Sequence, residues 1–317
     1  MLKTDLCNLL NIKYPIIQGG MAWVATGELA AAVSAAGGLG IIGAGSAPPD
    51  IVRQEISKVQ AATDKPFGVN VYYLSPYVDE LVNLVTEMKV PVVTTGAGNP
   101  GKHIAQFKEA GTIVLPVVSS VALAKRLARL GVDGFIAEGM ECGGHVGELT
   151  TMALVPQIVD AVELPVVAAG GIADGRGLVA ALALGACGVQ IGTRFICATE
   201  CTVHPNYKRA VLEAKDRDTV LTGLPGHEVR VLKNKLTRKF DELIANHGDI
   251  SSINELGIGK LRLAAIEGDV DEGSVMAGQV AAMVKGLKPA AEIITEVVSE
   301  AQLLLQKLSD YLGGTNA

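Results

Sequence analysis

The sequence has few aromatic residues and no long apolar run. Aromatic side chains make up 4% of the 317 residues, which disfavours a β-sandwich with an aromatic core. No apolar run of about 20 residues appears, so we expect no membrane-spanning helix. Asp5 and Asn8 interrupt the first residues, which is not typical of a secretory signal.

Cysteine and positive charge are also scarce. The five cysteines are odd in number and show no zinc-ligand spacing, which favours free thiols in a reducing compartment. The net charge of −6 argues against general nucleic-acid binding. We therefore expect a cytoplasmic protein with no nucleic-acid or membrane partner.

A dinucleotide-binding glycine motif is missing as well. No GxGxxG opens a helix after a strand with an acidic residue about 20 positions later. GAGNPG at 96–101 is the nearest approach, and it lacks that spacing. The open doubly wound sheet is therefore the alternative fold and not the preferred one.

Glycine is abundant, with 37 residues, and eight short apolar runs alternate with helical stretches. These runs do not alternate apolar with polar residues, which is typical of parallel strands covered on both faces. Ser120 and Asp174 are placed to cap two of the intervening helices. The pattern predicts an α/β protein with a closed (β/α)8 TIM barrel. The predicted strands cover 15–17, 38–43, 67–72, 90–95, 112–118, 134–138, 165–169 and 188–191.

The alternation ends after Arg194. Residues 200–286 are more polar, and we expect helices there at 207–215, 232–246 and 273–285. This segment predicts a smaller, mainly helical lobe over the carboxyl ends of the strands. The barrel would then comprise 1–199 plus 287–317, with an amphipathic helix at 290–312 packing back on it.

Two glycine turns follow the last two predicted strands. TIM barrels carry their chemistry at the carboxyl ends of the strands and often bind phosphate after strands seven and eight. Gly170 and Gly171 follow the seventh strand, and Gly192 and Thr193 follow the eighth. Their backbone N–H groups can bind a phosphate without a lysine. The pair of turns predicts a site for an organic phosphate.

The segment AEGMECGGHVG at 137–147 follows the sixth predicted strand. Gly143 and Gly144 lack a Cβ, so their backbone can approach a flat ligand, and His145 would lie beside it. The alternative is a turn with a surface histidine. Asn70 could donate to and accept from the pyrimidine edge of a flavin, or it could be a strand-end turn residue. Backbone groups of Gly20, Met21 and Ala22 could contact the ring edge, so the set of residues suits FMN.

Longer motifs resemble a known family. Between about Ile12 and Lys285 the chain is similar to the FMN-dependent enoyl-acyl-carrier-protein reductase II family, itself close to the nitronate monooxygenases (formerly 2-nitropropane dioxygenases). GGMAWVA, TTGAGNP, LTTM and GDVDEGSVMAGQ favour the reductase side. The matching segments are QGGMAWVA, GGLGIIGAG, KPFGVN, VVTTGAGNP, EGMECGGHVG, LTTM, AAGGIADG, GTRF, HPNYK, LKNKLTR and DVDEGSVMAGQ.

The resemblance implies roles for individual residues. It implies that His145 is the active-site histidine and that the two glycine turns hold the FMN phosphate. Ala22, Asn70 and Glu138 match flavin-contacting positions, and Gln279 would reach back toward the flavin. It further implies NADH or NADPH as reductant, a response to monovalent cations whose site cannot be placed, and a homodimer.

The expected reaction is reduction of the trans-2 double bond of an enoyl thioester by NAD(P)H, the last step of fatty-acid elongation. An acyl carrier protein is acidic, so a basic stretch without acids would suit docking, although it could also be a solvated helix face. Two rival functions remain, a nitronate monooxygenase and a non-catalytic, redox-sensing flavin barrel that uses Cys142 beside His145. The basic stretch contains Arg230, Lys233, Lys235, Arg238 and Lys239.

Overall fold

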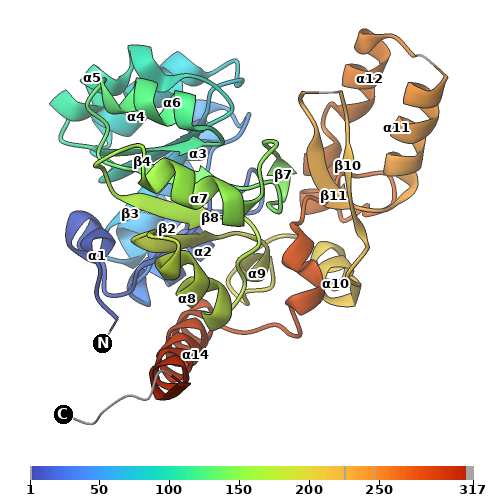
Figure 1. The fold of residues 1–317 in the computed structure, drawn as a ribbon. Helices are drawn as coiled ribbons and strands as arrows, with labels where there is room; N and C mark the ends of the chain where they lie inside the picture. The colour runs from blue at the N-terminus through green and yellow to red at the C-terminus, as the bar shows by residue number, and fades with distance from the viewer. Residues whose placement is uncertain (1, 225, 247, 312–317) are drawn as a thin grey trace, which may run out of the picture.

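A computed structural model describes residues 2–311 except 225 and 247, and it contains a closed barrel of eight parallel strands (Figure 1). Each barrel strand pairs with its successor, and the last closes on the first through Ile17 and Gln190. The TIM barrel is therefore confirmed, and the open sheet is excluded. The strands are β1 (Ile16–Gln18), β2 (Leu39–Gly43), β3 (Phe67–Tyr72), β4 (Val92–Gly96), β5 (Ile113–Val118), β6 (Phe135–Glu138), β8 (Val166–Ala169) and β9 (Gly188–Ile191).

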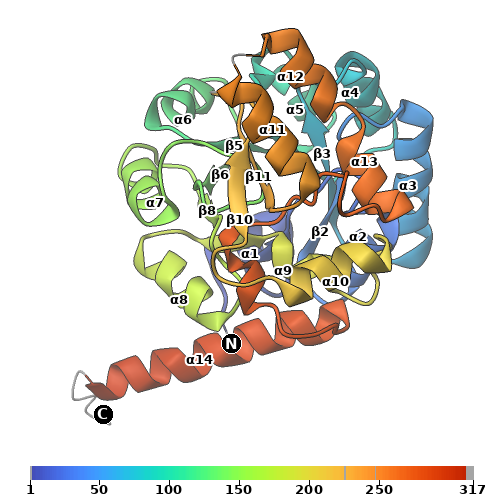
Figure 2. The ribbon, with the colours of Figure 1, turned by 90° about the vertical axis from the view of Figure 1, so that its right-hand side faces the viewer.

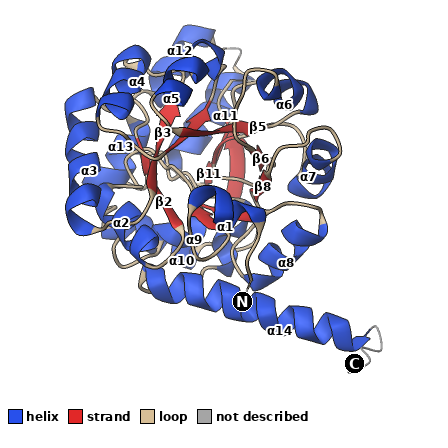
Figure 3. Ribbon diagram, turned by 90° about the vertical axis from the view of Figure 1, so that its left-hand side faces the viewer, coloured by secondary structure: helices blue, strands red, loops and turns tan. Residues whose placement is uncertain are grey.

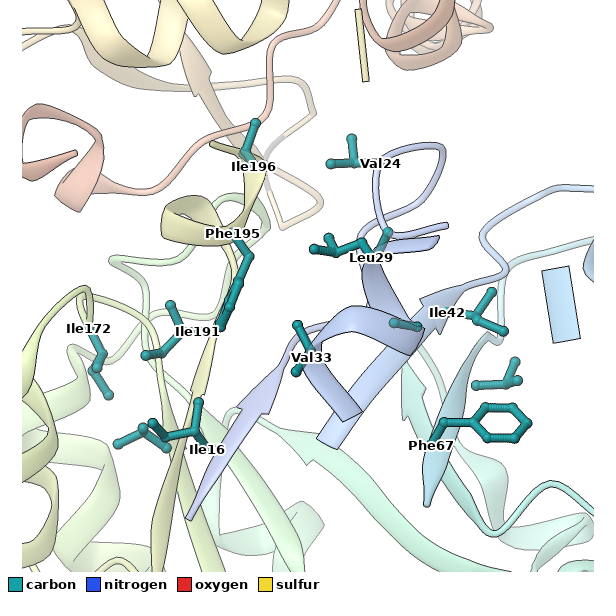
Figure 4. Packing of buried hydrophobic residues seen from close by; sticks show 14 of the residues in the cluster. Ile16, Val24, Leu29, Val33, Ile42, Phe67, Ile172, Ile191, Phe195 and Ile196 are labelled. Carbon is teal, nitrogen blue, oxygen red and sulfur yellow. The ribbon is translucent and has the colours of Figure 1, made fainter. Parts of the chain in front are cut away.

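Helices pack around the outside of the barrel and bury the outward side chains of the strands. Ile16 and Ile191 on adjacent strands lie near Phe195, and Val33 of α2 lies beside them (Figure 4). Every residue of β8 is buried, because helices cover its outer face and the barrel interior its inner face. The helices of this part are α2 (Gly27–Ala35), α3 (Pro49–Ala62), α4 (Val78–Glu87), α5 (Ile104–Glu109), α6 (Val121–Ala128), α7 (Thr151–Val159), α8 (Gly175–Ala183), α9 (Thr193–Ile196), α14 (Ala290–Tyr311) and the 3-10 turn η1 (Pro100–Lys102).

Two predicted helix caps are confirmed. The Ser120 hydroxyl accepts a hydrogen bond from the Leu123 N–H and starts α6. The Asp174 carboxylate accepts from the N–H groups of Arg176 and Gly177 and starts α8. Each cap satisfies amide groups that the first helical turn leaves without partners.

A short helix closes the amino-terminal end of the barrel. Helix α1 (Asp5–Leu10) lies across this end, in front of the strands in Figure 3. Its Leu6 and Leu10 are buried against inward side chains that include Ile17, Leu115 and Ile136. The interior of the barrel is thus filled at this end.

The lobe contains a β-hairpin that the sequence did not suggest. Strands β10 (Thr219–Thr222) and β11 (Val229–Leu232) form a sheet with β7 (Gly144–His145), which comes from the barrel (Figure 1). A helix predicted from 232 begins only at Lys235, because Asn234 forms a capping box with Thr237. The remaining elements are α10 (Pro205–Glu213), α11 (Lys235–Ala245), α12 (Ile250–Gly257), α13 (Lys260–Arg262), η2 (Leu263–Glu267) and η3 (Gln279–Met283).

Two other expectations are wrong in part. Residues 273–285 form no α-helix, because Val231 pairs with Met276 as a β-bridge and only a 3-10 turn follows. Helix α14 packs on the barrel through Ile294, Val297 and Ala301, but its last turns extend beyond the barrel (Figure 2). Leu303 and Tyr311 are 73% and 70% exposed there. No helix in the described ranges has the length and apolar character needed to cross a bilayer.

Candidate active site

A cavity of about 1030 Å3 lies between the carboxyl ends of the barrel strands and the lobe. It brings together residues from turns that are far apart in the sequence. Twelve of the thirteen residues proposed above for binding or catalysis line it. They are Gly20, Met21, Ala22, Asn70, Glu138, Gly143, Gly144, His145, Gly170, Gly171, Gly192 and Thr193.

The two glycine turns at one side of the cavity have the geometry expected for an anion site. Gly170 and Gly171 have φ values of +90° and +72°, a conformation that glycine adopts without steric cost. Within the described ranges, the N–H groups of Gly170, Gly171 and Gly192 donate to no other backbone group. The Thr193 hydroxyl accepts from the Gly278 N–H at 2.9 Å, which leaves its proton available for a ligand. These donors fit a phosphate.

Asn70 lies against the first turn. Its amide nitrogen donates to the Thr94 hydroxyl at 2.9 Å, so one amide hydrogen and the carbonyl oxygen remain for a ligand. A Cβ on Gly20 would come within 2.3 Å of the Asn70 Cβ, which explains why glycine stands there. The cavity also contains Gln190, which sequence reasoning missed. A polar residue inside the apolar strand GVQI was the available signal.

His145 belongs to strand β7, and its backbone pairs with Val229 of the lobe. The Tyr72 hydroxyl lies 3.5 Å from His145 Nε2, and the two ring centroids are 5.6 Å apart. The walls of the cavity partly desolvate the imidazole, and this desolvation, together with His227, lowers the pKa of His145 below its ordinary value. A neutral imidazole at pH 7 can donate one hydrogen bond to a substrate oxygen. Tyr72, two residues after Asn70 on the same strand, was also missed.

The glycine pair before His145 serves the protein backbone. A Cβ on Gly143 would lie 2.8 Å from the backbone of Ala277 and Gly278, so glycine is needed there for the lobe to pack. Gly144 has a φ of +80° where the chain enters β7. Both residues line the cavity, but their lack of a side chain is explained by these contacts without any flat ligand.

Glu138 and Cys142 are titratable groups in the segment that precedes His145, and both line the cavity. Burial raises the pKa of Glu138 to about 7, and the neighbouring Cys142 thiol offsets part of this rise. Cys142 is 7% exposed, and its thiol lies 3.3 Å from the His145 carbonyl oxygen, to which it donates. Burial, and then the neighbouring Glu138 carboxyl, raises the pKa of Cys142 well above its ordinary value. A reactive redox cysteine needs the opposite shift, so the redox-sensing function is disfavoured.

The lobe also contacts the barrel at the first turn. Arg262 lies over the Trp23 ring, 5.9 Å from its centroid, and both residues line the cavity. Trp23 has a φ of +62°, a strained backbone for a bulky residue, which marks this turn as shaped for a site. Neither residue stood out in the sequence.

The structure does not place Gln279 in the cavity. Gln279 is exposed and does not line the cavity, although its neighbours Gly278 and Val280 do. Its backbone N–H instead donates to the Glu141 carbonyl. No group of three or more His, Cys, Asp or Glu side chains in the described part of the chain could hold a metal ion.

The proposed docking stretch is also smaller than predicted. Arg230 is 4% exposed and faces the protein interior. Lys235 and Lys239 pair with Asp271 and Glu272, which come from a distant part of the sequence. Lys233 and Arg238 remain as exposed cations without an acidic partner in the described residues.

Fold and cavity together define a TIM barrel in which two glycine turns and a histidine face one cavity at the carboxyl ends of the strands. The nitronate monooxygenase family model matches residues 3–83 and 77–300, and the chain belongs to this family of oxidoreductases. FabK from Thermotoga maritima is 50% identical, with a TM-score of 0.95 over 98% of this chain and 100% of that chain.

Two curated relatives match over nearly their whole length. A probable nitronate monooxygenase from Staphylococcus saprophyticus is 36% identical over 96% of this chain and 99% of its own. An octahydro-indene-carboxyl-CoA dehydrogenase from Mycobacterium tuberculosis is 34% identical over 97% and 98%. The chain is thus similar to proteins named for different reactions.

Proposed function

We propose that the protein is an FMN-dependent enoyl-acyl-carrier-protein reductase that uses NAD(P)H. The observation that carries this proposal is the shared cavity, in which His145 and the two glycine turns face the same space. FabK, an enoyl-acyl-carrier-protein reductase II, matches along its full length at 50% identity, which supports the same reading.

The residues of the cavity fit FMN. Members of the family are FMN-dependent flavoenzymes. The amides of Gly170, Gly171 and Gly192 and the Thr193 hydroxyl would hold the phosphate, and Asn70 and the first turn would contact the ring. When bound, FMN supplies hydride acceptance from the nicotinamide and hydride donation to the enoyl β-carbon.

The protein itself would position the substrate and stabilise the charge that develops on it. Negative charge develops on the thioester oxygen as the β-carbon is reduced, and a donor aimed at that oxygen stabilises it. His145, neutral at pH 7 because its pKa is lowered, would be that donor, with Tyr72 beside its Nε2. The lobe covers the cavity and limits access of water to the reacting atoms.

The alternative function is nitronate monooxygenase. It is supported by the relative from Staphylococcus saprophyticus and by a nitroalkane oxidase structure at 30% identity with a TM-score of 0.84. In that reaction the reduced flavin meets oxygen and no nicotinamide is needed.

An absorption experiment separates the two functions. Under anaerobic conditions, NAD(P)H should bleach the flavin bands, and an enoyl-coenzyme A thioester should restore them. A protein that ignores NAD(P)H but consumes oxygen with an alkyl nitronate would instead be the monooxygenase.

Acyl carrier protein is the proposed partner. Within the stretch 230–239, Lys233 and Arg238 are the exposed cations without an acidic partner among the described residues, and they offer a small positive surface to an acidic protein. A cytoplasmic location and a homodimer complete the proposal. A monovalent-cation requirement would fit the family resemblance, but no residues are assigned to it.

A further inference from the structure

Arg230 is a buried arginine in the lobe that bonds to the turn carrying His145. It lies on β11, is 4% exposed and makes no ion pair with a described residue. Its Nε and Nη2 atoms donate to one acceptor, the Met140 carbonyl oxygen, at 3.0 and 2.9 Å. Burial is the largest influence on its guanidinium and lowers the pKa of Arg230. Burying a charge is costly, so the bonds to Met140 have to compensate for lost hydration.

The turn held by Arg230 contains the groups of the site. Met140 lies between Glu138 and Cys142, and the chain reaches His145 five residues later. Arg230 itself pairs in register with Gly144. Val229, its neighbour in the strand, pairs with His145.

Other parts of the lobe contact the same turn. The Glu141 carbonyl accepts from the Gln279 N–H at 3.0 Å, and the Val146 N–H donates to the Glu228 carbonyl at 3.3 Å. These contacts are single bonds between backbone groups. Arg230 is the side chain that adds two charge-assisted bonds, which are the stronger kind.

We infer that Arg230 is a positioning residue, which fixes the turn 138–147 through the Met140 carbonyl and so sets the place of His145 in the cavity. This inference deepens the proposed function and rests on it. Arg230 does not line the cavity, so it acts through the turn and not by contact with substrate.

The test uses Arg230→Met, which keeps the stem and removes the donors, in the FMN-loaded full chain. Hydrogen exchange measured by mass spectrometry should show faster exchange in peptides covering 140–147, because the turn loses two bonds. The kcat for enoyl-coenzyme A reduction should fall by about ten- to a hundredfold, as expected when a catalytic group is misplaced by about 1 Å. KM should stay within about threefold, because no substrate contact is removed.

Two further variants complete the design. Arg53→Met is the matched control, because Arg53 also donates two hydrogen bonds, at 3.0 and 2.9 Å, but to the exposed Glu87. It should change neither exchange in 140–147 nor kcat. Arg230→Lys keeps the charge and one donor atom, so its exchange rate in 140–147 and its kcat should lie between those of the wild type and of Arg230→Met. If Arg230→Met does not fold, Arg230→Lys is measured in its place.

The exchange measurement does not depend on which reaction the enzyme performs. Unchanged exchange in 140–147 together with wild-type kcat in Arg230→Met would overturn the inference, as would full wild-type behaviour of Arg230→Lys if the methionine variant is unfolded. Faster exchange with no enoyl reduction by the wild type would instead remove the proposed function and leave the positioning role standing.

Discussion

His145 and Val229 are paired across two antiparallel strands, one from a barrel turn and one from the lobe. The candidate catalytic histidine therefore lies at the edge of a sheet whose other strands belong to the lobe. The barrel alone would leave this backbone without its partner strand. The lobe thus helps to build the site as well as cover it.

Replacing His145 by alanine should slow enoyl reduction by about 100-fold or more, because the donor to the thioester oxygen is lost. FMN should remain bound, since the phosphate turns are untouched. Steady-state turnover measures the loss of activity, and the flavin absorbance of the purified variant shows whether FMN is retained. Normal turnover in the alanine variant would remove His145 from the mechanism.

His227→Ala is the control for this substitution. His227 lowers the pKa of His145 by charge repulsion but does not line the cavity. The variant should keep its turnover at pH 7 and should shift the acid limb of the pH profile toward higher pH.

Gly171→Ala should weaken FMN binding by about tenfold or more. The residue has a φ of +72°, where alanine is strained by about 1–2 kcal/mol, and its new Cβ would lie 3.3 Å from the Glu141 Cβ. Fluorescence titration of FMN into the FMN-free protein gives the affinity. Gly111→Ala is the matched control, because Gly111 has a φ of +76° and no atom within 4 Å of the added Cβ. Equal affinity in the two variants would exclude a role of this turn in phosphate binding.

Glu138 should make the stability of the FMN-free protein depend on pH. Its folded-state pKa of about 7 lies above the ordinary 4.5, so the folded protein binds more protons than the unfolded one between these values. The free energy of unfolding should therefore fall as pH rises from 4.5 to 7, by about 1–3 kcal/mol, and then level off.

Glu138→Gln should remove this part of the pH dependence, because glutamine does not ionise. Urea unfolding of both proteins at several pH values measures the difference. If the two unfolding free energies differ by the same amount at pH 4.5 and pH 7, then Glu138 titrates normally.

Charge reversal at Lys233 and Arg238 should weaken catalysis with carrier-bound substrate by about tenfold and leave the coenzyme A thioester unaffected. The ratio of kcat/KM values for the two substrates is the measurement. A loss shared equally by both substrates would argue against docking at this surface.

The barrel could be predicted because its signals are local. The run FGVNVY predicts β3 with the observed bounds, and Asp174 predicts the start of α8 as its N-cap. The glycine turns after β8 and β9 line the cavity, as their position after the last two barrel strands predicts. In each case the residues that decide the structure are neighbours in the sequence.

The lobe was harder to predict because its structure depends on distant partners. Strand β11 pairs with β10, which precedes it in the chain, but it also pairs with β7 and with Met276, and these two partners are distant in the sequence. The stretch 230–239 contains no acid, yet Asp271 and Glu272 neutralise two of its lysines in space. The sequence predicts a surface cation at Arg230, and the fold instead places it beside the Met140 carbonyl.

Helix α1 has a consequence for the direction from which ligands approach. Its leucines fill the amino-terminal end of the barrel, so a ligand does not reach the cavity through the barrel interior. The cavity is instead bordered by the carboxyl ends of the strands and by the lobe. Under the proposed function, the nicotinamide and the thioester would therefore both approach the flavin from the lobe side.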